Sequence, residues 1–140
     1  MIINSKRLRD EELKCRAKAA EVLDFVGLSH IGHRYIADTT QEERKRVAFA
    51  LAMATDPELV LLDEPAASLT EGEIDKMRTL ILKLRDAGTT ILLIEHVLPL
   101  LTSVSDRLIV LDQGTLISEG TPSDVIADPR VVEAYLGGAA

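Results

Sequence analysis

The chain has 140 residues, of which 46% are hydrophobic and 28% are charged, and its formal net charge is −7 at pH 7. This composition is typical of a globular protein with one domain and a modest core, and it argues against intrinsic disorder. The negative charge argues against a partner held through phosphate contacts, so no nucleic-acid partner is expected.

Cys15 is the single cysteine of the sequence, which excludes an internal disulfide and a cysteine-based zinc site and favours a reducing compartment. No apolar run approaches the roughly 20 residues that a membrane span requires, and the first residues lack the apolar core of a signal peptide. We therefore expect a cytoplasmic protein that reaches a membrane only through partner subunits.

The first predicted helix covers residues 10–26, where apolar side chains recur at helical spacing, and Gly27 is expected to be its C-terminal cap. Residues 28–38 are expected to form a loop. His30 and His33 within it lack a third metal ligand, so solvent-facing polar side chains are the simpler interpretation.

A second helix is expected to begin near Thr40, because Thr40 and Glu43 have the spacing of a capping box. The helix is polar at its start and almost wholly apolar later, so its far end is expected to be buried. Asp56-Pro57 ends it.

The run from Leu59 to Leu62 predicts a strand buried on both faces of a parallel sheet, and Pro65 must end it. Asp63 and Glu64 then lie at the carboxyl end of this strand, where open α/β sheets bind their ligands. Two adjacent acids there suit Mg²⁺ together with a base that orients a water. For an isolated pair of acids, a solvated turn is an equally good interpretation.

A second capping box at Thr70 and Glu73 opens a helix that continues to about residue 87, with Gly88 as its cap. Residues 89–94 are expected to form a second buried strand. The remaining predicted elements are short: a helix at 98–105, a strand at 107–111, a hairpin through 112–114 into 115–118, and helices at 121–127 and 130–136. This alternation predicts an α/β fold with a mostly parallel sheet covered by helices.

Glu95 and His96 end the second strand, so they are expected to share a sheet edge with Asp63 and Glu64. An acid pair with a histidine suits metal-assisted phosphoryl transfer, with a carboxylate on Mg²⁺ and the histidine near the terminal phosphate. An ordinary hydrolase and a histidine bonded only to backbone are the alternatives.

In their order and spacing these motifs make the chain resemble the carboxyl-terminal part of an ABC-transporter ATP-binding subunit, which has a P-loop NTPase fold. LVLLDEP at 59–65 resembles the Walker B strand, AASLT at 66–70 the D-loop, and ILLIEH at 91–96 the strand entering the H-loop. DQGTLISEGTP at 112–122 resembles the element after the last core strand. The ending SDVIADPRVVEAYLG at 123–137 most resembles the subunits of branched-chain amino acid importers.

The resemblance implies that Asp63 holds Mg²⁺, that Glu64 is the general base for ATP hydrolysis, and that His96 contacts the γ-phosphate. The D-loop residues that would face a second ATP-binding subunit are Ser68, Leu69 and Thr70. Family D-loops often carry Asp or Asn in place of Thr70. The chain then corresponds to one incomplete domain, with residues 10–57 as the end of the helical subdomain and signature region and residues 58–140 as the remainder.

Two motifs depart from the family pattern. No G-x-x-x-x-G-K-[ST] phosphate loop occurs in the 140 residues, so the isolated chain is expected to bind ATP weakly or not at all. The signature positions fall on Thr39, Thr40, Gln41, Glu42 and Glu43. There Gln41 and Glu42 replace small glycines, and the carboxylates suit the helix dipole but repel a phosphate. This half of a composite nucleotide site is therefore interpreted as degenerate.

Three functional hypotheses follow. The chain represents an ABC-importer ATPase subunit that works with membrane subunits, or it is a non-catalytic ABC-like protein that docks on or regulates a transporter. The third hypothesis is a chromosome or DNA-repair ATPase. Such a protein would be expected to show long heptad segments and a more basic surface, and this sequence shows neither. The resemblance puts the phosphate-loop strand between the strands at 90–94 and 107–111, and its loss would expose apolar faces, so self-association is also expected.

Overall fold

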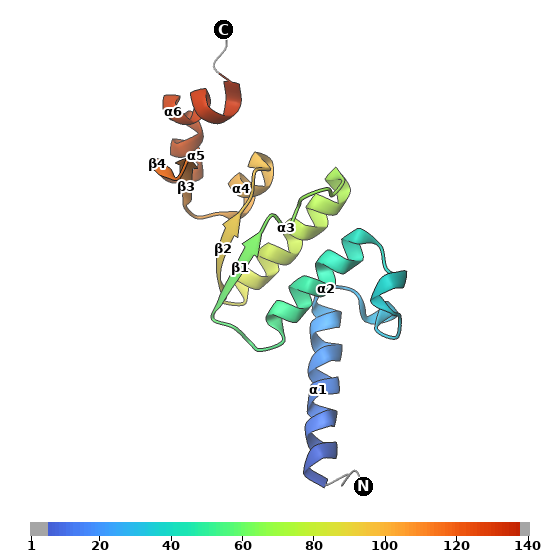
Figure 1. The fold of residues 1–140 in the computed structure, drawn as a ribbon. Coiled ribbons are helices and arrows are strands. Elements are labelled where there is room, and N and C mark those ends of the chain that lie inside the picture. Colours follow the sequence, from blue (N-terminus) through green and yellow to red (C-terminus); the bar gives the residue numbers. More distant parts are fainter. Residues whose placement is uncertain (1–5, 138–140) are drawn as a thin grey trace. The chain divides into compact units, whose positions relative to one another are not determined.

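The computed structural model describes residues 6–137, and the chain divides into two compact units, one up to Leu92 and one from Leu93 onward. The first unit contains the following elements (Figure 1): α1 (Lys6–Phe25), α2 (Gln41–Met53), β1 (Leu59–Asp63), α3 (Glu71–Asp86) and the start of β2 (Thr90–Ile94). The second unit contains α4 (Leu98–Val104), β3 (Leu108–Asp112), β4 (Thr115–Gly120), α5 (Pro122–Ala127), α6 (Pro129–Val131) and a π-helical stretch at Val132–Gly137. Among the described helices, none has the length and apolar character needed to cross a membrane.

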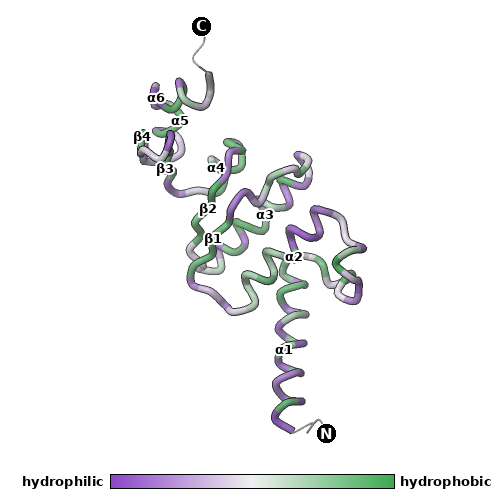
Figure 2. Tube along the Cα trace, in the orientation of Figure 1, coloured by the Kyte–Doolittle hydropathy of each residue, from purple (hydrophilic) through white to green (hydrophobic). Residues whose placement is uncertain are grey.

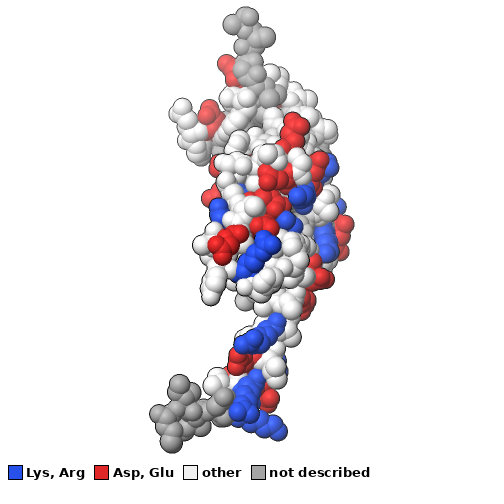
Figure 3. Space-filling model, turned by 90° about the vertical axis from the view of Figure 1, so that its right-hand side faces the viewer, with Lys and Arg blue, Asp and Glu red and all other residues white. Residues whose placement is uncertain are grey.

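Helix α1 begins at Lys6, earlier than the predicted start at residue 10. Its polar first turns are supported by ion pairs one turn apart, such as Arg7 with Glu11 at 3.1 Å, and Figure 3 shows acidic and basic side chains interspersed along its lower end. The helix ends as predicted at Gly27, whose φ of 71° is left-handed. The Gly27 amide donates to Asp24 at 2.9 Å and the next amide donates to the Leu23 carbonyl, which completes a Schellman cap.

Helix α2 begins with the predicted capping box, in which the Thr40 hydroxyl accepts from the Glu43 amide at 3.1 Å. The predicted burial of its far end is wrong for one side of the helix. Phe49 and Ala50 are buried, whereas Leu51 is 73% exposed. The reason is that the helix buries only one stripe of side chains, so an apolar stretch longer than that stripe must leave part of itself in solvent.

Strands β1 and β2 form a two-stranded parallel sheet, to which the Thr90 amide adds a bond to the Glu58 carbonyl at 2.9 Å. Figure 2 shows both strands as hydrophobic segments of the chain. One face of β1 is buried through Val60 and Leu62. The apolar stripe of α3 is buried as well, as its spacing predicts, and this stripe includes Met77, Leu80, Ile81 and Leu84.

The prediction that both faces of this sheet are buried is wrong. Leu59, Leu61 and Leu92 are 53%, 67% and 55% exposed. Side chains two apart on a strand lie on one face, so these leucines mark an uncovered apolar face, which we call the open sheet face. Within the first unit, the side chains of β1 that point to the opposite face, Val60 and Leu62, are the buried ones.

In the second unit, β3 and β4 form the predicted hairpin, antiparallel with Asp112 opposite Thr115. The two turn residues, Gln113 and Gly114, have φ of 46° and 79°, as a type I′ turn requires. Within the described part of the second unit, β3 and β4 form a two-stranded sheet. A small core behind the hairpin is formed by Leu108, Val125 and Val131.

Asp128 joins the hairpin to the last helices. Its carboxylate accepts from the Ser118 hydroxyl at 2.8 Å, from the Arg130 amide at 2.9 Å and from the Arg130 guanidinium at 2.7 Å. The Arg130 side chain, followed by the Arg130 amide and Ser118, lowers the pKa of Asp128 well below its ordinary value of 3.8.

The second unit is therefore expected to lose stability in acid. A depressed pKa in the folded state means that the charged carboxylate stabilises the fold above pH 3.8, and that this contribution is lost as the pH falls through the folded pKa. Asp128→Asn should destabilise the hairpin at neutral pH, with a difference from the unmodified chain that shrinks below that value. Hydrogen exchange of the β3–β4 amides against pH measures this, and a pH-independent difference would contradict it.

Candidate functional site

The acid pair lies at the end of β1, where the sequence predicts it. Asp63 is the last residue of the strand and Glu64 follows it, and both side chains are exposed. The Glu64 carbonyl accepts from the Lys45 ammonium of α2 at 3.1 Å. This contact ties α2 to the turn after β1, so the candidate signature helix and the acid pair belong to one connected piece of structure.

The turn after the acid pair is conformationally strained. Glu64 and Ser68 have φ of 44° and 61°, in the left-handed region that non-glycine residues rarely occupy. Each such residue costs of order 1–3 kcal/mol and is often found at functional sites. The Leu69 amide donates to the Ala66 carbonyl at 3.1 Å, and Thr70 then begins α3. The predicted D-loop residues are therefore held in one tight, defined turn.

The second predicted capping box is present at the start of α3. The Glu73 carboxylate accepts from the amide and the hydroxyl of Thr70, at 2.8 and 2.7 Å. The Thr70 amide, and after it the hydroxyl, lowers the pKa of Glu73. The side chain of Thr70 is thus engaged in starting the helix.

The five signature positions form the N-terminus of α2, and most of their polar groups bond within the chain. The buried Thr39 donates its hydroxyl to the Ile36 carbonyl at 2.6 Å. The Glu43 carboxylate accepts from the Thr40 amide at 2.8 Å, and this bond lowers the pKa of Glu43. Gln41 is exposed. The Glu43 carboxylate at this helix end would repel an approaching anion.

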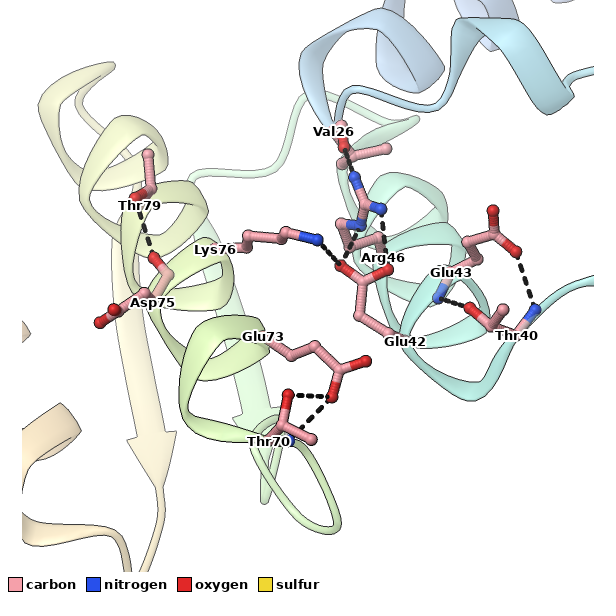
Figure 4. A network of polar contacts seen from close by, with 10 residues as sticks. All are labelled: Val26, Thr40, Glu42, Glu43, Arg46, Thr70, Glu73, Asp75, Lys76 and Thr79. Carbon is pink, nitrogen blue, oxygen red and sulfur yellow. Dashed lines mark hydrogen bonds and ion pairs between the residues drawn. The ribbon is translucent and has the colours of Figure 1, made fainter.

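Glu42 is the centre of a buried ionic network, shown in Figure 4. Its side chain is 7% exposed and pairs with Arg46 through two contacts, at 2.7 and 2.8 Å. Arg46 also donates to the Val26 carbonyl at 3.0 Å, and the Lys76 ammonium of α3 lies 4.0 Å from Glu42. The network therefore joins the end of α1, the start of α2 and the middle of α3.

Glu95 and His96 follow β2 and belong to the second unit. The buried Glu95 carboxylate accepts from the amides of His96 and Val97, at 3.0 and 3.3 Å. The His96 side chain is 66% exposed. Glu95 thus organises the turn into α4, and the His96 imidazole is accessible from solvent.

The donor chemistry at Asp63 fits a hard cation. Magnesium is commonly held through one or two carboxylates together with water and substrate phosphates, and the exposed Asp63 carboxylate meets that requirement. Within the described residues no group of three or more metal-binding side chains occurs. Any Mg²⁺ here would take its remaining ligands from water and a nucleotide.

Sequence reasoning did not predict two features of the site, namely the burial of the Glu42–Arg46 ion pair and the contact of Lys45 with the Glu64 carbonyl. The spacing of Glu42 and Arg46, one helical turn apart, is a signal for an ion pair, but it does not reveal that the pair is buried. The Lys45 contact to the Glu64 carbonyl carries no sequence signal, because it depends on how α2 packs beside the end of β1.

Comparison with known proteins identifies the protein family of this chain. A model described as "ABC transporter" matches residues 2–67, and a model described as "Branched-chain amino acid ATP-binding cassette transporter" matches residues 115–140. A solved ATP-binding cassette of an ABC transporter in its ADP conformation superposes with a TM-score of 0.82 and 32% identity, covering 89% of this chain and 51% of that chain. A nucleotide-free cassette gives a TM-score of 0.81 and 30% identity, covering 98% and 53%. The chain belongs to the ABC-transporter ATP-binding family.

Among its relatives, the high-affinity branched-chain amino acid transport ATP-binding protein LivG of Salmonella typhimurium is 37% identical over 97% of this chain and 54% of its own length. BraF of Pseudomonas aeruginosa, which carries the same description, is 36% identical over the same shares. An arginine transport ATP-binding protein of Corynebacterium glutamicum is 32% identical over 87% of this chain and 48% of its own length. The chain spans about half the length of these curated relatives.

Proposed function

We propose that this chain supplies the Walker B, D-loop and H-loop portion of an ATP-hydrolysing subunit for branched-chain amino acid import. The observation that carries the proposal is the position of Asp63 and Glu64 at the carboxyl end of β1, in a chain 37% identical to LivG over 97% of its length. The 26 C-terminal residues support the substrate class, because the model that they match describes branched-chain amino acid transporters.

The proposed chemistry divides between three side chains. Bound Mg²⁺ would neutralise charge on the β- and γ-phosphates. Asp63 contributes an oxygen ligand to that ion, Glu64 accepts a proton from the attacking water, and the exposed His96 imidazole contacts the γ-phosphate. The strained turn after Glu64 fixes the backbone of the proposed base, while Ser68 and Leu69 face a second ATP-binding subunit.

The proposed partners are the membrane subunits of a transporter and a second ATP-binding subunit. The relatives are described as transport ATP-binding proteins, and such proteins act beside membrane components. The proposed location is the cytoplasmic face of the cell membrane, where the chain is held through these partners.

We further propose that the chain alone binds Mg-ATP weakly, because its 140 residues contain no phosphate loop and α2 presents carboxylates at its N-terminus. Calorimetric titration of the purified chain with Mg-ATP is expected to give a dissociation constant weaker than about 1 mM. Titration with Mg²⁺ alone and with the Asp63→Asn variant provides the controls. A micromolar constant that Asp63→Asn abolishes would contradict the proposal.

A second candidate function is a non-catalytic ABC-like protein that binds a transporter. The internal engagement of Glu42 and Glu43 favours it, because both carboxylates serve the fold at positions where a nucleotide-contacting signature needs small residues. ATP hydrolysis by an assembly that includes a phosphate loop discriminates between the two candidates. Turnover that depends on Glu64 supports the ATPase, and transporter binding without turnover supports the second candidate.

A further inference from the structure

We propose that Lys45 is a positioning residue for Glu64, the proposed base. Its ammonium holds the Glu64 backbone in the conformation that fixes where the carboxylate lies. The inference deepens the proposed function and rests on it for the role of Glu64, whereas the contact itself belongs to the structure of the first unit.

The Glu64 backbone has a conformation that its own sequence disfavours. Its φ of 44° is left-handed, which strains any residue that has a Cβ atom. Glu64 also precedes Pro65, and the residue before a proline prefers an extended conformation. Contacts from elsewhere in the fold must therefore help to hold this residue in the left-handed region.

The Glu64 carbonyl accepts hydrogen bonds from two groups. The Ala67 amide donates to it within the turn at 3.2 Å, and the Lys45 ammonium of α2 donates to it at 3.1 Å. Hydrogen bonds from charged donors are the stronger ones, and such a bond is comparable in free energy with the strain of one left-handed residue. The Lys45 contact is therefore large enough to decide the conformation of Glu64.

Helix α2 is itself held in place, so the Lys45 side chain starts from a defined point. Arg46, the next residue, is fixed in the buried pair with Glu42, and the Thr40 hydroxyl caps the start of the helix (Figure 4). Lys45 is half-buried. Because α2 cannot rotate without breaking these contacts, the ammonium reaches the turn after β1 from one direction.

The backbone of Glu64 determines where its side chain can act. Fixing its φ and the plane of its carbonyl fixes the direction of the Cα–Cβ bond, and with it the region that the exposed carboxylate can reach. A general base works only within hydrogen-bond reach of the proton that it accepts. Lys45 therefore acts on catalysis through the position of Glu64, without touching the substrate.

Hydrogen exchange on the full chain tests the contact without nucleotide. In Lys45→Met we expect the Ala67 amide to exchange about 10-fold faster, because the turn that it closes loses its second support. Lys45→Arg keeps a cationic donor and should keep the protection. The Glu43 amide, which donates to Thr40 at the start of α2, should exchange at an unchanged rate in both variants.

A double-mutant cycle tests the role in catalysis, in an assembly that includes a phosphate loop. Lys45→Met is expected to lower kcat for ATP about 10-fold with KM unchanged, and Lys45→Arg should restore most of it. In the Glu64→Gln background, Lys45→Met should cause no further loss, because the base that it positions is absent. Lys14→Met, at an exposed lysine of α1, is the control and should leave turnover unchanged.

An Ala67 amide whose exchange does not respond to Lys45→Met would overturn the proposal. So would an equal loss of turnover in both Glu64 backgrounds, since that result indicates a general structural effect. If Glu64→Gln leaves turnover undiminished, the assignment of Glu64 as the base fails, and the exchange of Ala67 still decides whether Lys45 holds the turn.

Discussion

Replacing Arg46 with methionine is expected to lower the free energy of unfolding of the first unit by about 3–5 kcal/mol. The reason is that the Glu42 carboxylate, 7% exposed, would remain buried without its two-point partner. The Val26 carbonyl would also lose its donor. Urea denaturation followed by far-ultraviolet circular dichroism gives the free energy for both proteins.

A double variant distinguishes the destabilisation caused by an unpaired buried carboxylate from the net contribution of the ion pair to the free energy of unfolding. Arg46→Met combined with Glu42→Leu is expected to recover much of the loss, because a buried ion pair replaced by apolar side chains is often near neutral in stability. The exposed pair of Arg16 and Glu12, also one helical turn apart, is the matched control, and its loss should cost at most about 1 kcal/mol. An Arg46→Met effect as small as that of the control would contradict the structural role assigned to the network.

Glu64→Gln is expected to lower the turnover of ATP about 10²- to 10⁴-fold in the assembly of the full chain with a half-domain that carries a phosphate loop. Glutamine keeps the size of the side chain but cannot accept a proton from the attacking water. The affinity for Mg-ATP should change little, because the proposed role of Glu64 is proton transfer. Steady-state hydrolysis and nucleotide binding, measured on the same preparation, separate the two effects.

Glu58 provides the control for this experiment. It is an exposed carboxylate beside the opposite end of β1, so Glu58→Gln removes the same charge without removing the proposed base. Asp63→Asn should act differently, by weakening Mg²⁺-dependent nucleotide binding. Turnover that survives Glu64→Gln undiminished would show that another group accepts the proton.

Local chemistry explains which features were predictable from sequence. The predicted helix caps are present, because each depends on hydrogen bonds within a few residues of chain. They are the capping boxes at Thr40 and Thr70 and the glycine cap at Gly27. The turn through Gln113 and Gly114 belongs to the same class. The order of strands and helices follows from such signals, and so does the position of Asp63 at the end of a strand.

Which surfaces of a strand or helix are covered depends on the packing of distant parts of the chain. The apolar pattern of Leu59 to Leu62 is the same whether one or two layers pack on the strand, so burial of both faces was predicted and an open sheet face was found. The same reason applies to Leu51 on α2. Burial depends on which surfaces meet, and that information is spread over residues distant in the chain.

Asp63 and Glu64, with the residues around them, show the difference between features that follow from sequence and features that depend on packing. The residue pattern is enough to predict that Asp63 and Glu64 end a strand, and it shows that no phosphate loop lies within the 140 residues. The packing of α2 is what allows the Lys45 ammonium to donate to the Glu64 carbonyl, and it is also what buries Glu42 in a network with Arg46. A carboxylate in water and a carboxylate buried against a guanidinium have the same sequence signal, because solvation is a property of the packed molecule.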